Sequence, residues 1–347
     1  MEVADLKPLV SILIPAYNAQ EWISDTLQSA VAQTWPNREI IVVNDGSTDQ
    51  TSAIAGTFES AGVRVVNQKN QGAAAARNTA FSLSRGNYIQ WLDADDLLSP
   101  NKIAAQVGVL SESRSRRTVL SSSWALFMYR QNRAEFVPTP LWCDLSPGEW
   151  LVRQMEENVY MQTATWLVSR EVTEAAGPWD TRLLGDDDGE YFSRVLLASD
   201  GTRFVPEAKV YYRMSGSSSL SYIGTSDKKK NAQWLSMKLH IQYVRSQEDS
   251  QRSRAACVTY LQNWMTFFYP ERLDIFEQAT ALAQELGGQL KVPRLSWKYY
   301  PIKSIFGWPL TRRAQVVLPR LRWSLHASWD KALSQMANRK HRTGFAA

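Results

Sequence analysis

The chain has 347 residues, of which 44% are hydrophobic and 21% are charged, with a formal net charge of +5. This composition is that of an ordinary globular protein and excludes disorder over most of the length. The two cysteines, Cys143 and Cys257, are too few for a disulfide framework or a cysteine-based zinc site. The chain has no apolar run of about 18 residues and no signal-like start, so a cytoplasmic protein is expected.

Charge is distributed unevenly along the chain. Residues 1–224 carry 19 basic and 26 acidic side chains, whereas residues 225–347 carry 20 basic and 8 acidic ones. The asymmetry predicts two regions, 1–224 and 225–347, with the boundary beside the Ser-rich stretch 215–221. The basic region is expected to meet an anionic partner. Because no nucleic-acid recognition motif accompanies the charge, nucleic acid is not the expected partner.

Strands and helices are predicted to alternate through the first 100 residues. Short β-rich apolar runs predict strands at 9–14, 39–43, 63–66 and 88–92. Apolar residues at helical spacing predict helices at 21–33, 51–60 and 73–84. This alternation is typical of βαβ units, so the predicted fold class is α/β, with a mostly parallel sheet flanked by helices.

The rest of the chain is predicted to be mixed and then mainly helical. Helical spacing recurs at 101–113, 149–158 and 185–198, and a strand is expected at 203–212. Beyond the boundary, helices are predicted at 231–245, 253–268 and 273–286, followed by a Trp-rich tail that prolines interrupt. The C-terminal region is therefore expected to be helical.

Polar clusters follow three of the predicted strands, at residues 15–18, 44–47 and 93–96. Ligands of parallel α/β sheets bind outside the carboxyl ends of the strands. Each cluster alone could be a turn held by Asn or Asp side chains. Their recurrence at one sheet edge, with a further loop at 70–72, favours a binding site.

The acidic cluster Asp93, Asp95 and Asp96 carries the clearest chemistry. Three carboxylates packed after an apolar strand repel one another unless a cation offsets their charge. Oxygen ligands of this kind select Mg²⁺ or Mn²⁺. The chain has no P-loop and no GxGxxG motif, so phosphate would be held by the metal, helped by Arg77 and the helix that opens at Gly72.

Four motifs together resemble family 2 glycosyltransferases, in the same order and spacing over about residues 9–103. They are the segments at 10–18, 39–49, 70–78 and 92–96, the last of which holds the DxD pattern Asp93-Ala94-Asp95. The resemblance implies a GT-A fold and an inverting enzyme that uses a nucleotide-diphosphate sugar and a divalent metal. It continues more weakly to about residue 221.

The resemblance also implies roles for individual residues. On the donor side it assigns Pro15, Tyr17 and Asn18 to the nucleoside pocket and Asp45 to the base, which is expected to be uracil. It assigns Gly72 and Arg77 to the base or diphosphate, Asp93 to the ribose or sugar, and Asp95 to the metal. Asp93 and Asp96 are further candidate metal ligands. A GDP- or dTDP-sugar is the alternative to a UDP-sugar.

The acceptor side is expected at residues 185–194. When Arg194 is aligned with the family's arginine, the family's acidic pair falls on Asp187 and Asp188. Asp188 then matches the catalytic base, with Asp187 and Asp186 as alternatives. The other interpretation is that these acids cap a helix, and both roles are compatible because one carboxylate is enough for the base.

Two positions differ from the family pattern. Asn44 stands where many relatives have Asp, and no histidine follows Tyr212-Arg213, so metal binding would rest on the aspartates and the diphosphate. The histidines His240, His326 and His341 are expected at the surface of the C-terminal region. In the mechanism that the resemblance implies, one carboxylate deprotonates an acceptor hydroxyl as it attacks the anomeric carbon.

Aromatic and basic residues interleave in the tail. The set comprises Trp297, Trp308, Trp323, Trp329, Lys298, Lys303, Arg312, Arg313, Arg320, Arg322 and Lys331. Such a mixture suits peripheral contact with an anionic membrane surface on the inner face, or a helical subdomain packed on the catalytic region.

Taken with the family resemblance, the sequence predicts an enzyme of polysaccharide or glycolipid synthesis acting on a glycan or lipid-linked acceptor. The alternative is a non-catalytic nucleotide- or glycan-binding protein or membrane-surface scaffold.

Overall fold

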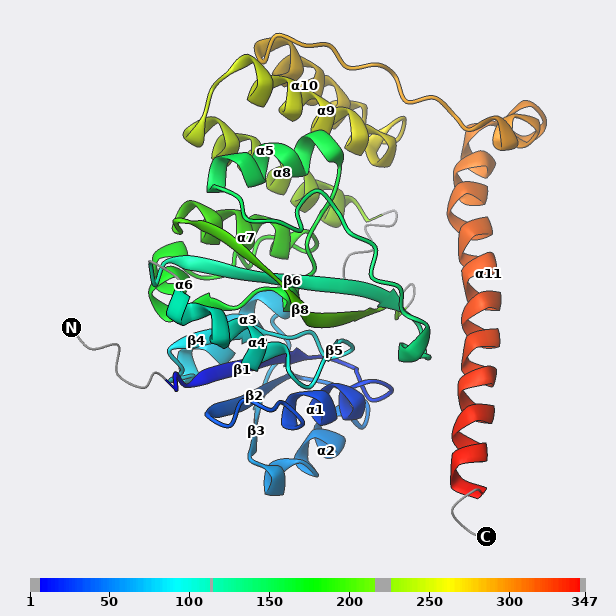
Figure 1. Ribbon diagram of the computed structural model, residues 1–347. Helices are drawn as coiled ribbons and strands as arrows, with labels where there is room; N and C mark the ends of the chain where they lie inside the picture. Colours follow the sequence, from blue (N-terminus) through cyan, green and yellow to red (C-terminus); the bar gives the residue numbers. More distant parts are fainter. Residues whose placement is uncertain (1–6, 113–114, 216–225, 344–347) are drawn as a thin grey trace.

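A five-stranded sheet lies at the centre of the computed structural model, which describes residues 7–112, 115–215 and 226–343 (Figure 1). Its strand order is β3-β2-β1-β4-β7, in which β7 runs antiparallel to the other strands. The strands are β1 (Val10–Ala16), β2 (Arg38–Asp45), β3 (Val63–Gln68), β4 (Tyr88–Trp91) and β7 (Val168–Ser169). Every residue of β1 is buried, as its continuous apolar run predicts.

Helices cover both faces of this sheet. They are α1 (Ile23–Val31), α2 (Thr51–Gly56) and α3 (Ala73–Leu83). Successive strand residues point to opposite faces, so Ile12 and Val42 pack with α1 and α2, whereas Leu13 and Ile41 pack with α3. The predicted α/β class and alternating order are confirmed, and the four parallel strands β1, β2, β3 and β4 end in loops at the same sheet edge.

A second, three-stranded sheet lies beside the first. Its order is β5-β8-β6, from β5 (Leu97–Leu98), β8 (Gly201–Arg213) and β6 (Thr118–Phe127). β6 and β8 run parallel to each other, and β5 pairs with β8 immediately after the acidic residues 93–96. The second sheet therefore forms one wall next to the predicted DxD motif.

The remaining elements connect or cover these sheets. The helices are α4 (Lys102–Gly108), α5 (Pro147–Glu157), α6 (Arg170–Ala176), α7 (Asp187–Leu197), α8 (Asp227–Gln247), α9 (Gln251–Phe268) and α10 (Leu273–Glu285). Short 3-10 turns lie at η1 (Glu59–Ala61), η2 (Val109–Glu112), η3 (Gln131–Arg133), η4 (Thr163–Thr165) and η5 (Trp297–Tyr299). The predicted helices at 149–158, 185–198, 231–245, 253–268 and 273–286 are confirmed within a few residues.

The helices after residue 226 share their core with the N-terminal region. Trp234 of α8 and Leu261 of α9 belong to the same buried cluster as Leu13 and Trp91 of the central sheet. Residues 216–225, which include the proposed boundary and most of the Ser-rich stretch, lie outside the described residues. The two regions remain a proposal based on charge, and their buried side chains form a continuous core.

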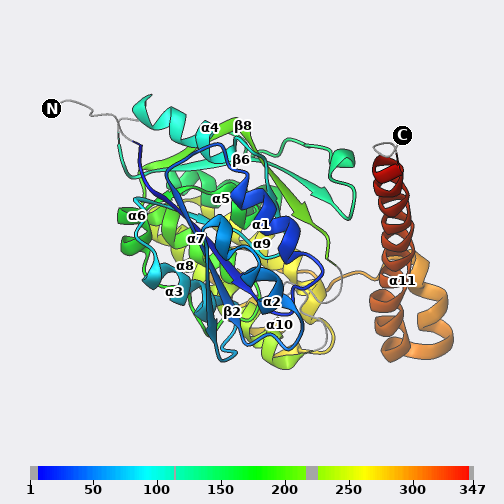
Figure 2. The same cartoon turned by 90° about the horizontal axis from the view of Figure 1, so that it is seen from below.

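The tail forms the helix α11 (Tyr300–Thr343), which is broken at Gly307, where φ is 73°. The sequence predicted a helical C-terminal region that ends in a proline-interrupted tail, and the structure shows that this tail is itself helical on both sides of residue 307. Figures 1 and 2 show α11 standing alongside the body, and Asp330 attaches it by accepting a hydrogen bond of 2.9 Å from the Tyr129 amide. Lys331 also pairs with Glu21 at 2.6 Å.

The tail prediction included several arginines whose side chains lie outside the described residues: Arg312, Arg313, Arg320 and Arg322. Within the described ranges, no helix combines the length and the apolar character that crossing a bilayer requires.

Candidate active site

The loops after β1 and β2 are joined by hydrogen bonds around Asn18. Its backbone has φ of 48°, and its side-chain oxygen accepts from the Thr48 amide at 2.9 Å. The Asn18 amide in turn donates to the Ser47 hydroxyl at 2.9 Å. Tyr17 beside it is 52% exposed, whereas Pro15 is buried inside β1. Of the three predicted nucleoside-pocket residues, Tyr17 and Asn18 thus lie at the surface of the sheet edge.

Asp45, the last residue of β2, holds the loop that precedes α3. It is 2% exposed and accepts from the amides of Gln71 at 2.9 Å and Gly72 at 2.8 Å. Gly72 has φ of 94°, a conformation that glycine adopts without steric cost. Gln68 also donates to Asp45 at 2.7 Å. A carboxylate offers about four acceptor positions, so the predicted base contact is compatible with these three bonds.

Arg77 connects the acidic residues of the two predicted halves of the site, Asp93 and Asp187. The guanidinium donates to Asp93 and to Asp187, each at 2.7 Å, and lies 4.3 Å from the ring centre of Trp179. Arg77 is 4% exposed. Burial alone would lower its pKa, but the charges of Asp93 and Asp187 outweigh burial and raise the pKa. Arg77 therefore stays charged and fixes two acidic residues that are 94 positions apart in the chain.

Asp95 and Asp96 differ in what surrounds them. Asp95 is partly buried, and burial together with the nearby charge of Asp93 raises the pKa of Asp95 to about 6. Asp96 is fully buried, with one carboxylate oxygen accepting from the Arg213 amide at 2.8 Å and the other in a short contact with Gln162. Both oxygens of Asp96 thus already have protein partners, so Asp96 is less available than Asp95 as a metal ligand.

The predicted acidic pair lies in the first turn of α7. Asp188 accepts from the Thr163 hydroxyl at 3.2 Å, and Thr163 belongs to η4. Burial, together with the charges of Asp187 and Asp186, raises the pKa of Asp188 to about 7. Among the described residues, no cation lies at hydrogen-bond distance from Asp188, and a carboxyl group of this kind with a pKa near neutrality is suited to accept a proton.

The other two acidic candidates are engaged elsewhere. Asp187 is occupied by Arg77, and Asp186 accepts from Ser236 of α8 at 2.6 Å. The geometry therefore favours Asp188 among the three candidates for the base.

Aromatic side chains lie next to the acidic site. Tyr160 precedes η4, is 50% exposed and contacts Trp124 with ring centres 5.1 Å apart. The ring of Tyr212 also contacts Trp124, with ring centres 6.2 Å apart. Burial and the charge of Asp188 raise the pKa of Tyr160. Tyr160 therefore stays uncharged near the candidate base.

Some residues of the site were not predicted. Thr163 and Gln162 reach Asp188 and Asp96 from a 3-10 turn that carries no motif, so single-sequence periodicity gave no signal for them. His240 was expected at the surface, and this was wrong, because it is 3% exposed and faces α7. Across the three described ranges, no group of three acidic, histidine or cysteine side chains is placed to hold a metal by itself.

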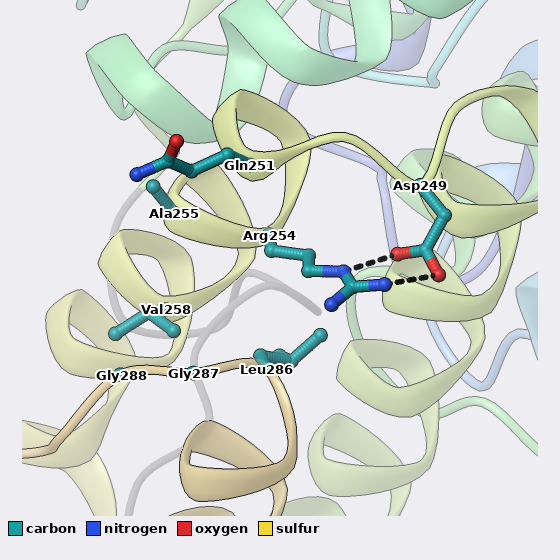
Figure 3. Close-up of a pocket in the computed structure, with 8 residues that line it drawn as sticks. All are labelled: Asp249, Gln251, Arg254, Ala255, Val258, Leu286, Gly287 and Gly288. Atoms are coloured by element: carbon teal, nitrogen blue, oxygen red, sulfur yellow. Dashed lines mark hydrogen bonds and ion pairs between the residues drawn. The ribbon is translucent and has the colours of Figure 1, made fainter.

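A surface cavity of about 530 Å³ lies away from this site, between α9 and the residues that follow α10 (Figure 3). Its lining comprises Asp249, Gln251, Arg254, Ala255, Val258, Leu286, Gly287 and Gly288. Arg254 pairs with Asp249 at 2.8 Å within the cavity wall. Because these two charges satisfy each other, they do not point to a ligand.

Comparison with known proteins gives one family match. Residues 11–125 match the family model described as Glycosyl transferase family 2. An uncharacterized glycosyltransferase of Rickettsia bellii is 39% identical over 121 residues, covering 34% of this chain and 17% of that protein. The putative teichuronic acid biosynthesis glycosyltransferase TuaG of Bacillus subtilis is 40% identical over 109 residues, covering 30% and 43%. The match thus spans less than half the length of each relative.

The fold has a solved counterpart. The crystal structure of S. aureus TarS 1–349 in complex with UDP-GlcNAc superposes with a TM-score of 0.64 and 17% identity, over 80% of each chain. This likeness extends well beyond the matched family segment, into the helices after residue 226. It confirms the predicted GT-A type of α/β architecture.

Proposed function

Because the chain belongs to glycosyl transferase family 2 through residues 11–125, we propose that it moves a sugar from a nucleotide-diphosphate sugar to a hydroxyl of a glycan or lipid-linked acceptor. The observation that carries this proposal is the arrangement around Arg77. One guanidinium links Asp93 of the DxD motif to Asp187, the neighbour of the candidate base Asp188. In this proposal, the buried guanidinium of Arg77 thus contacts a residue of the donor site and a residue of the acceptor site.

The proposed donor is a UDP-sugar. A TarS structure of the same fold contains UDP-GlcNAc, which supports this nucleotide as the donor. Asp45 is the proposed partner of the base, with Tyr17 and Asn18 at the nucleoside. The name of TuaG supports a role in making an envelope polysaccharide.

A divalent cation, Mn²⁺ or Mg²⁺, fits the residues present. Asp95 is a partly buried carboxylate whose pKa is raised, and a cation beside it would offset that unfavourable charge. Asp93 already has one oxygen on Arg77, so we propose Asp95 as the main protein ligand and Asp93 as a weaker one. Asp96 is proposed to stabilise the loop at residues 93–96 through its hydrogen bonds with Arg213 and Gln162. When bound, such an ion would offset charge on the departing diphosphate.

The proposed chemistry at Asp188 is a single displacement. Its carboxylate takes the proton of the acceptor hydroxyl as that oxygen attacks the anomeric carbon from the face opposite the nucleotide. Thr163 keeps the carboxylate oriented, and Arg77 holds Asp187 so that it does not compete for the proton. One displacement inverts the anomeric configuration.

Binding of nucleotide diphosphates tests the donor site. UDP with Mn²⁺, at 100 times its Kd, should stabilise the folded chain by about 3 kcal/mol and raise the thermal midpoint. Asp95→Ala or EDTA should remove that shift. Asp200→Ala, which removes a largely exposed carboxylate outside the site, is the matched control and should keep it. If no UDP, GDP or dTDP shifts the wild-type midpoint with either metal, the proposed function loses its basis.

A peripheral membrane contact is proposed for α11. Leu318 and Trp329 are 48% and 68% exposed, and their spacing of 11 residues, about three turns, places them on one face. The docking residue Asp330 lies on a different face of the helix. Exposed aromatic and aliphatic residues in a region rich in Lys and Arg suit the surface of an anionic bilayer.

Vesicle sedimentation of the full chain tests this contact. Phosphatidylglycerol-containing vesicles should sediment the wild type more than phosphatidylcholine vesicles, and Leu318→Ser with Trp329→Ser should reduce that fraction. Val137→Ser, at a residue 67% exposed on the body, is the control. Equal sedimentation of the wild type and the double variant would refute a membrane role for α11.

A further inference from the structure

One side of α8 carries polar residues that face the start of α7. Gln233, Ser236, His240 and Tyr243 recur at spacings of three, four and three, so they form one stripe along the helix. The first three are at most 3% exposed. Polar groups this deeply buried require partners. Those of Gln233 and Ser236 lie in the turn that carries the acidic residues, whereas His240 Nδ1 lies 3.4 Å from the Tyr260 hydroxyl of α9.

Asp186 is the residue that receives them. Ser236 donates to its carboxylate at 2.6 Å and Gln233 at 3.1 Å, while the His240 ring nitrogen Nε2 lies 3.9 Å from the same oxygen. Asp186 precedes the first residue of α7, yet its side chain caps none of the α7 amides. Its carboxylate is therefore committed to α8.

The backbone at Asp186 is in the left-handed region, with φ of 56°. A non-glycine residue keeps this conformation only where its surroundings enforce it, although Asp tolerates it better than most. Gly189 shows how closely the turn is packed, because a Cβ there would lie 2.3 Å from a carboxylate oxygen of Asp186. The chain direction at residue 186 decides where the next two side chains point.

We propose that Gln233 and Ser236 of α8 are positioning residues for transfer: by holding Asp186 in its left-handed conformation, they direct Asp187 onto Arg77 and Asp188 onto Thr163. The proposal rests on the proposed function for its catalytic consequence. In this proposal the helical C-terminal region shapes the active site indirectly, because Gln233 and Ser236 act through Asp186 and not by contacting the donor or the acceptor.

The test uses the full chain with Gln233→Met and Ser236→Ala combined. Hydrogen exchange of the amides at 187–190 should become at least fivefold faster, and kcat should fall at least tenfold. The Kd for UDP should stay within twofold, because Asp45 and Asn18 lie on other elements. Ser246→Ala is the matched control, since this α8 hydroxyl donates only within its own helix, to the Tyr243 carbonyl.

A conservative change separates positioning from a direct role of Asp186. Asp186→Asn keeps an oxygen that can accept from Ser236 and tolerates the left-handed backbone, so it should lower kcat less than about fivefold. Unchanged exchange at 187–190 in the double variant would overturn the proposal, as would a parallel loss of kcat and UDP affinity. If the wild type turns over no sugar nucleotide, the proposed function fails, while the exchange experiment still decides whether α8 positions this turn.

Discussion

Replacing Asp188 by Asn is expected to lower kcat by about 10²–10⁴-fold, the range that a positioned general base contributes. The amide can still accept the hydrogen bond from Thr163 but cannot take a proton. UDP affinity should remain, because the proposed donor contacts lie in the loops after β1, β2 and β4. Turnover of a UDP-sugar together with UDP binding by calorimetry measures both quantities.

The pH dependence follows from the same residue. Burial and the charges of Asp187 and Asp186 raise the pKa of Asp188 to about 7, and only the deprotonated form can act as base. In the wild type, kcat/KM should therefore fall about tenfold per pH unit below about 7. The residual rate of Asp188→Asn should lack this limb, whereas Asp187→Asn should retain it. A limb that persists in Asp188→Asn would assign the base elsewhere.

Stability provides the control for that comparison. A carboxyl whose pKa is higher in the folded than in the unfolded chain weakens folding as it ionises, between about pH 4 and pH 7 here. Asp188→Asn removes this penalty and should be at least as stable as the wild type at pH 8. Lost activity in that variant would then come from the chemistry and not from unfolding.

Replacing Arg77 by Met is the second change with a large expected effect. It leaves the buried Asp187 and the partly exposed Asp93 without their cation, and removing one partner of a buried ion pair costs about 3–5 kcal/mol. Without the charge of Arg77, the pKa of the buried Asp187 carboxyl should rise further, which favours its protonated form. The variant should unfold at markedly lower urea concentration and lose affinity for UDP with Mn²⁺.

Two further variants serve as controls for Arg77→Met: one keeps the positive charge at residue 77, and the other removes an exposed arginine elsewhere. Arg77→Lys keeps a cation but cannot donate in a fork to both carboxylates, so an intermediate loss is expected. Arg182→Met removes an arginine that pairs with Asp180 at 2.6 Å but is 67% exposed, and it should leave the urea midpoint unchanged. Equal effects of Arg77→Met and Arg182→Met would show that Arg77 does not organise the site.

Local pattern was enough to predict the elements of the sheet edge. The run Val10–Ala16 is buried on both faces, and the strands and turns around Asp45 and Asp93 lie where apolar runs and polar clusters predicted them. The helix carrying Asp187 and Asp188 was also predicted from its spacing. These features depend on residues within about ten positions of one another, which periodicity reports directly.

Contacts between distant segments could not be predicted in this way. The bond from Arg77 to Asp187 spans 110 positions, and that from Gln162 to Asp96 spans 66. The hydrogen bond from Ser236 to Asp186 spans 50 positions. Because the sequence pattern does not show that α8 packs against this turn, His240 on the same side of α8 was predicted to be a surface histidine. The long helix α11 was missed because prolines and glycine interrupt its sequence pattern.

A crystal structure of the chain with UDP-GlcNAc and Mn²⁺, on the Asp188→Asn variant to prevent turnover, would test the account most directly. We expect the uracil at Asp45, the diphosphate and metal at Asp95, and the anomeric carbon facing residue 188 with room for an acceptor hydroxyl between them. A nucleotide bound away from Asp45 and Asp95, or a sugar turned away from residue 188, would contradict the proposed transfer reaction.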